Sequence, residues 1–107
     1  MIELKKDYTY KGVTYHQLLK NDKLVIYRCQ RFQGEKLMET YYEIFRPKVE
    51  QPNKFMDDEW ERYPSNENFG VWAWCCYTKG SALKVLDKHF NDNGSPLTNK
   101  ELVELIL

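Results

Sequence analysis

Three cysteines and two histidines are the most reactive side chains in this sequence: Cys29, Cys75, Cys76, His16 and His89. A zinc site or a thiol nucleophile needs such residues at fixed spacing, and the chain has no C-x-x-C pair and no His-x-x-x-His pair. Cys75 and Cys76 are adjacent, so on a strand they would point to opposite faces of the sheet. Free cysteine is among the most frequently buried residue types. We therefore expect reduced thiols in the core, with at least Cys29 and Cys75 shielded, and no catalytic residue, no metal and no cofactor.

A run of acidic side chains follows Met56: Asp57, Asp58, Glu59 and Glu61. If this segment is helical, Asp57 and Glu61 share one face and would form a pair of ligands for a divalent cation. Acidic runs in loops more often face solvent or pair with nearby bases, and we expect that outcome here. The sequence contains no Gly-rich phosphate loop, no G-x-S-x-G and no H-E-x-x-H.

The chain that must position these side chains is 107 residues long, and we expect a single domain over residues 1–107. Its 16 basic and 16 acidic side chains cancel, which argues against a dedicated nucleic-acid-binding protein. Residues 1–48 carry ten Lys or Arg and six Asp or Glu, whereas residues 49–70 carry two and six. The sequence shows no secretory signal and no apolar run of membrane-spanning length, so we expect a cytoplasmic protein.

Hydrophobic patterning predicts an α+β fold. The expected elements are strands over 8–10, 13–19, 23–32, 38–46 and 70–77, and a helix over 79–90 that is capped by Thr78. Short turns between the first four strands indicate an antiparallel meander, to which the late strand is added. A capping box at 98–101 predicts a short C-terminal helix. We expect an antiparallel sheet of four to five strands with the long helix packed on one face.

Residues 48–68 lack periodicity and contain Pro52 and Pro64, so they should form a long loop, with a short helical turn near residues 57–60. The segment also contains four large apolar side chains, Phe55, Met56, Trp60 and Tyr63. We expect these side chains to pack on the body of the domain.

Trp72 and Trp74 are two positions apart on the expected late strand, which places them on one face. The helix after Tyr77 must cover one face of the sheet. The small side chains of Ala73 and Cys75 would let it approach closely, so we expect it on their side. The two tryptophans would then lie on the far face. Either the 48–68 loop covers them, or they form an apolar patch that binds a partner.

One block of this sequence resembles small uncharacterised proteins encoded by bacteriophages and by integrated mobile elements of bacteria. The likeness covers roughly residues 8–91 and rests on five short stretches and the amphipathic helix that follows them. The stretches are residues 42–46, 63–65, 69–70, 73–75 and 77–78. That family has no known activity, so the resemblance implies no catalytic or binding residues. It implies a bacterial cytoplasm and an origin in a phage or mobile element.

The function expected from the sequence is a non-enzymatic interaction module, a phage- or mobile-element-encoded modulator that binds a host protein through an aromatic sheet face. The candidate partner-binding residues are Trp72, Trp74, Trp60, Arg28 and Arg46. The alternative is a single-stranded nucleic-acid-binding protein that uses the same face, with rings for stacking and arginines for phosphates. A homodimer through the tryptophan face is a third hypothesis.

Overall fold

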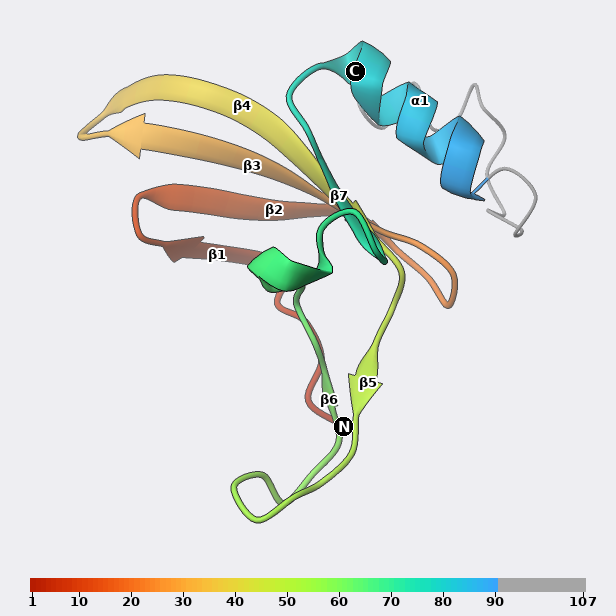
Figure 1. Cartoon of the computed structure of the whole chain (residues 1–107). Helices are drawn as coiled ribbons and strands as arrows, with labels where there is room; N and C mark the ends of the chain where they lie inside the picture. The colour runs from red at the N-terminus through yellow and green to blue at the C-terminus, as the bar shows by residue number, and fades with distance from the viewer. Residues whose placement is uncertain (91–107) are drawn as a thin grey trace.

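The computed structural model describes residues 1–90 and has a five-stranded antiparallel sheet at its centre (Figure 1). Its strands are β1 (Asp7–Tyr10), β2 (Val13–Lys20), β3 (Val25–Gln33), β4 (Lys36–Phe45) and β7 (Ala73–Cys76), in the order β1-β2-β3-β4-β7. A two-stranded sheet is formed by β5 (Val49–Glu50) and β6 (Trp60–Glu61), a 3-10 turn η1 spans Asn66–Asn68, and one helix, α1, spans Lys79–Phe90. The predicted α+β class and the antiparallel sheet of four to five strands are confirmed, with five strands present.

The meander forms where the turn residues allow it. Lys11 and Gly12 both have positive φ, 50° and 78°, which is the backbone of a tight two-residue hairpin turn between β1 and β2. Gly34, at φ 62°, lies in the turn between β3 and β4. Each consecutive pair of strands is antiparallel. The meander and the positions of its turns therefore follow the sequence prediction.

Helix α1 begins where the sequence predicts, directly after Thr78. The Ser81 backbone N–H donates to Thr78 Oγ1 at 3.0 Å, so Thr78 satisfies one of the free amides of the first turn. Ala82, Leu86 and Phe90 are buried on the helix and pack against Leu24, Ile26, Tyr42, Ile44 and Cys76 of the sheet. This aliphatic cluster forms one of the two cores.

The helix covers the opposite face of the sheet from the one predicted. Trp74 and Cys76 lie beneath α1, whereas Ala73 belongs to the core on the other side of the sheet. The small residue that permits close approach is Ala82, on the helix itself, which is fully buried. Trp72 lies on the face away from the helix because it is in the turn before β7. Two-residue alternation therefore does not relate Trp72 to Trp74.

The second core fills the helix-free face of the sheet. It is built from buried Val13, Val25, Tyr27, Cys29, Phe45, Trp72 and Ala73, with further aromatic rings packed around them. Tyr63 reaches this core from the 48–68 segment, with its ring centroid 5.0 Å from that of Phe45 and 5.2 Å from that of Tyr27. The expectation that the segment packs on the body is thus correct for Tyr63.

The part of that segment before Tyr63 projects away from the sheet. Residues 48–62, named the arm below, hold β5, β6 and their connection, and they extend from the side of the sheet opposite α1 (Figure 1). The predicted helical turn near residues 57–60 is wrong, since Trp60 begins strand β6. Phe55 is 80% exposed, so it does not pack on the body either. The predicted C-terminal helix after residue 98 lies outside the described residues.

Candidate functional site

Trp74 and Arg46 lie together at the C-terminal end of α1. The Trp74 ring stacks on His89, with 4.1 Å between centroids, and meets Phe90 edge-on. Arg46 Nη2 donates to the His89 carbonyl oxygen at 3.0 Å, and its guanidinium lies 5.8 Å from the Trp74 centroid. Through these contacts, the two candidate partner-binding residues hold the C-terminal end of α1 against the sheet.

The other three candidates lie apart from that pair and from one another. Trp72 is 9% exposed on the helix-free face, where Lys48 and Arg62 lie over its ring at 5.6 and 6.0 Å. The two ends of the arm therefore cover Trp72, whereas Trp74 is covered by α1, so the sequence-based alternative in which residues 48–68 cover both rings is correct for Trp72 alone. Trp60 is half-buried on the arm, and Arg28 lies on β3 opposite His16 and Tyr42. The five residues do not form one surface.

The thiols divide between the two sides of the sheet, as their adjacency predicts. Cys29 and Cys76 are buried, but Cys75 is exposed, so the expectation that Cys75 is shielded is wrong. The alternation placed Cys75 on the correct side of the strand, opposite Cys76, and the error came from placing the helix over it. Within residues 1–90, no cluster of three His, Cys, Asp or Glu side chains could hold a metal ion.

Two side chains of the acidic run on the arm, Asp58 and Glu61, bond to protein groups within residues 1–90. Glu61 accepts a hydrogen bond from the Leu4 backbone N–H at 3.0 Å and forms an ion pair with Lys20. Asp58 accepts from the backbone N–H of Glu59 at 2.8 Å. Because the segment is not helical, Asp57 and Glu61 are not brought together on a helical face.

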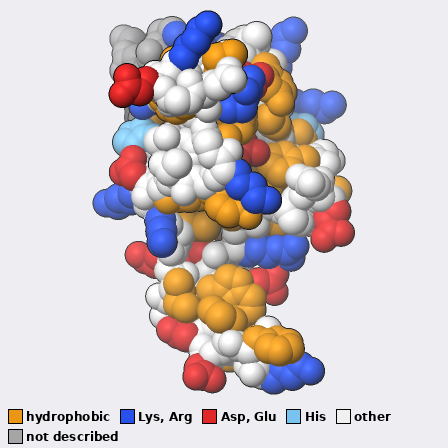
Figure 2. Space-filling model, turned by 90° about the vertical axis from the view of Figure 1, so that its left-hand side faces the viewer, with side chains coloured by type: hydrophobic (Ala, Val, Ile, Leu, Met, Phe, Trp, Pro, Cys, Tyr) orange, Lys and Arg blue, Asp and Glu red, His pale blue; other side chains and the backbone are white. Residues whose placement is uncertain are grey.

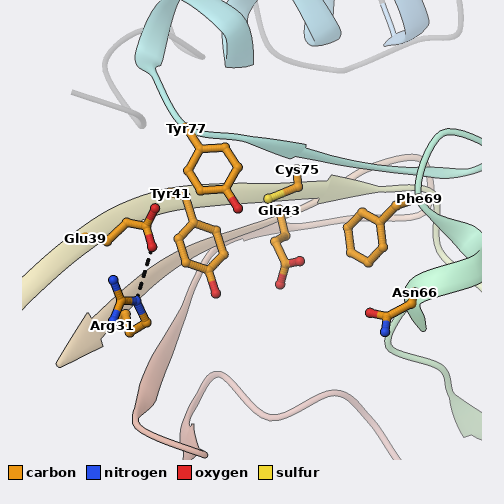
Figure 3. A pocket seen from close by; sticks show the side chains of 8 residues that line it. All are labelled: Arg31, Glu39, Tyr41, Glu43, Asn66, Phe69, Cys75 and Tyr77. Atoms are coloured by element: carbon orange, nitrogen blue, oxygen red, sulfur yellow. Dashed lines mark hydrogen bonds and ion pairs between the residues drawn. The ribbon is translucent and has the colours of Figure 1, made fainter. Parts of the chain in front are cut away.

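A pocket of about 470 Å³ opens on the helix-free face, and sequence reasoning did not identify it. It is lined by Arg31, Glu39, Tyr41, Glu43, Asn66, Phe69, Cys75 and Tyr77. Three of these alternate along β4, which turns them to one face of the sheet. Figure 3 shows the Tyr41 and Tyr77 rings on one side of the pocket, Phe69 and Asn66 on the other, and Glu43 between them.

Glu43 is a carboxylate in the second core, only 9% exposed. Its Oε1 accepts a hydrogen bond from the Tyr63 hydroxyl at 2.7 Å and one from the Cys29 thiol at 3.6 Å. Burial raises the pKa of Glu43 above its usual 4.5, and the two hydrogen bonds offset only part of that rise. At the rim, Arg31 and Glu39 neutralise each other through an ion pair of 3.2 Å.

The pocket is poorly suited to nucleophilic chemistry. Cys75 on β7 lies opposite Glu43 on β4 in the register of the sheet. Partial desolvation and then the nearby Glu43 carboxylate raise the pKa of the Cys75 thiol, which disfavours the reactive thiolate. Neither His16 nor His89 lines the pocket to act as a base. The arrangement is better suited to binding a ligand than to converting one.

The burial of Glu43 predicts a particular dependence of stability on pH. A carboxyl whose pKa is raised by folding binds its proton more tightly in the folded state than in the unfolded one. The free energy of unfolding should therefore fall as pH rises from 4.5 through the folded-state pKa of Glu43. Urea denaturation from about pH 4 to pH 8 measures this effect in wild type and in Glu43→Gln. The free energy of unfolding of the wild type should fall relative to that of Glu43→Gln as the pH rises. Parallel pH profiles for the two proteins would contradict the assignment.

No protein-family model, no curated protein and no solved structure matches this chain. The resemblance to phage and mobile-element proteins therefore stays a prediction from the sequence. No helix within residues 1–90 is long and apolar enough to span a membrane.

Proposed function

We propose that this protein is a non-enzymatic interaction module whose arm docks onto a protein partner. The observation that carries the proposal is the gathering of exposed apolar side chains on the arm and the N-terminal segment beside it. These side chains are Met1, Ile2, Val49 and Phe55. Figure 2 shows hydrophobic side chains over the lower part of the molecule, where the arm extends. Exposed apolar side chains that gather on one projecting element indicate an interaction site more strongly than single residues scattered over a surface do.

The N-terminal segment and the arm form one unit. The Ile2 backbone N–H donates to the Glu59 carbonyl, and the Glu61 N–H donates to the Ile2 carbonyl, both at 2.8 Å. Ile2 thereby pairs in parallel with Trp60, a residue that the sequence proposed for partner binding. Three short extended segments thus present their apolar side chains from one projecting element.

The tip of the arm holds Phe55 in a defined position. Asn53 Oδ1 accepts hydrogen bonds from the backbone N–H groups of Phe55 and Met56, at 2.8 and 3.0 Å. Such side-chain turns fix the backbone locally. The Phe55 ring is therefore presented to solvent by a structured turn, with Lys54 Nζ 5.0 Å from its centroid. A preorganised aromatic side chain is well suited to anchor an interface.

Charge on the arm favours a protein partner over nucleic acid. The arm carries five Asp or Glu side chains and three Lys or Arg, so it is acidic overall, and such a surface repels phosphates. Arg31 and Arg46 are engaged with Glu39 and with the His89 carbonyl. We therefore infer a partner segment with apolar side chains flanked by Lys or Arg. The bacterial cytoplasm and the phage or mobile-element origin remain part of this proposal and rest on the sequence resemblance.

The test is a selection of random dodecapeptides displayed on phage against the immobilised 107-residue protein. Enriched peptides should combine an aromatic or aliphatic residue with Lys or Arg. Phe55→Ser should weaken their binding about tenfold or more, as expected for an interface anchor. Tyr10→Ser is the matched control, because Tyr10 is also an exposed aromatic residue but lies on β1.

Two outcomes would overturn the proposal. One is a selection without enrichment, or with binders that Phe55→Ser and Tyr10→Ser affect equally. The other is tight binding of a fluorescein-labelled thymidine 20-mer that weakens steeply with salt, which would favour the nucleic-acid alternative. Size-exclusion chromatography with light scattering tests the homodimer hypothesis in the same preparation.

A further inference from the structure

We propose that the pocket on the helix-free face binds an organic cation, an alkylammonium group such as a lysine side chain carries, with Glu43 as its counter-ion. The site is separate from the arm, so this inference goes beyond the proposed function.

The walls of the pocket offer aromatic faces to a cation. Tyr41 and Tyr77 lie side by side on one wall, with ring centroids 5.4 Å apart and planes inclined by 35°. Phe69 stands on the opposite wall (Figure 3). The negative face of an aromatic ring attracts ammonium groups, and several rings around one space strengthen that attraction.

The floor of the pocket offers a carboxyl group that has no cationic partner within residues 1–90. Both hydrogen bonds to Glu43 end on Oε1, and Oε2 accepts none from residues 1–90. Figure 3 shows this carboxylate directed into the space between the Tyr41 ring and Phe69. A buried carboxylate without a cationic partner is costly for a fold. A ligand that brings a positive charge to Oε2 would remove that cost.

The basic residue at the rim of the pocket is paired with a carboxylate other than Glu43. The basic residue among those that line the pocket is Arg31, and it forms an ion pair with Glu39 at 3.2 Å. With that pair neutral, Glu43 gives the pocket its net charge. An anionic ligand would meet an acidic floor, and a neutral apolar ligand would leave the carboxylate unpaired. Charge complementarity therefore selects a cation with a short apolar stem.

The test is a titration of the 107-residue protein with butylammonium chloride, followed by NMR of the aromatic and backbone resonances at constant ionic strength. We expect saturable shifts at Tyr41, Phe69 and Tyr77. 1-Butanol, the neutral analogue, should produce none of them. Equal shifts with both compounds, or no shifts with either, would overturn the proposal.

Variants separate this site from nonspecific binding. Tyr77→Ala should weaken butylammonium binding about three- to thirtyfold, the range expected for one cation–π contact. Tyr77 is 62% exposed, so this variant should fold normally. Glu43→Gln should abolish saturable binding.

Two matched variants serve as controls. Tyr10→Ala should have no effect, although Tyr10 is also an exposed ring with a lysine nearby. Phe55→Ser should likewise leave butylammonium binding unchanged, so this site and the arm can fail independently. Butylammonium binding that Tyr77→Ala and Glu43→Gln both leave intact would place the cation elsewhere.

Discussion

Leu86→Ala should lower the free energy of unfolding by about 2–5 kcal/mol, the usual cost of truncating a buried leucine. Leu86 is 3% exposed and belongs to the cluster that joins α1 to Ile26 and Ile44. Twelve residues are too few for a helix to be stable alone in water, so α1 depends on this contact. The loss is large against the total stability of about 5–15 kcal/mol that is typical of a domain.

Urea denaturation monitored by circular dichroism measures this loss. Lys84→Ala is the control, because Lys84 lies on the same helix but is exposed. Its effect should stay within about 0.5 kcal/mol. A loss of less than about 1 kcal/mol in Leu86→Ala would show that the helix does not rest on the sheet at this point.

The meander, its turns and α1 could be predicted because each depends on local chemistry. Gly12 permits the tight hairpin turn, Pro47 follows the last residues of β4, and Thr78 caps the helix. Each signal acts over a few residues and needs no tertiary information.

The side of the sheet that the helix covers could not be read from Ala73 and Cys75 alone. In β4, Tyr42 and Ile44 face one side, whereas Tyr41 and Glu43 face the other. The pairing of Ile44 with Trp74 and of Glu43 with Cys75 extends this difference to β7. A helix over the Cys75 side would have buried the Glu43 carboxylate beneath aliphatic side chains, which is costly. The face that α1 covers therefore depends on the polarity of the side chains on β4. The register that pairs these side chains with β7 is known only from the folded sheet.

The pocket and the arm were missed for a related reason. Asn66 and Phe69 are neighbours at η1 but lie far from Tyr41 in the sequence, and only the fold brings them over the sheet beside it. The sequence predicts that residues 48–68 pack on the body as one loop because Phe55, Trp60 and Tyr63 occur within nine residues. In the structure these three residues have different roles, since Tyr63 enters the second core while Phe55 stays in solvent. Periodicity cannot separate them in a segment that has none.

Phe45→Ala should be the more damaging of the two core substitutions, with a loss of about 3–5 kcal/mol. Phe45 is fully buried, stacks parallel to Tyr27 at 6.0 Å and meets Tyr63 and Trp72 edge-on. Tyr63 and Trp72 bracket the segment that carries η1 and Phe69. The substitution should therefore loosen one wall of the pocket as well as lower global stability.

Two measurements distinguish these effects of Phe45→Ala. Urea denaturation gives the global loss, with Leu37→Ala as the control because Leu37 is 46% exposed near the other end of β4. Amide hydrogen exchange below the unfolding transition should show faster exchange at residues 66–72 in Phe45→Ala than in the control. If the stability loss is below about 1 kcal/mol, or if exchange over these residues is unchanged, then the helix-free face is not a second core anchored on Phe45. The pocket would then lack the support of that core, because its shape depends on the aromatic packing around Phe45 and Tyr63.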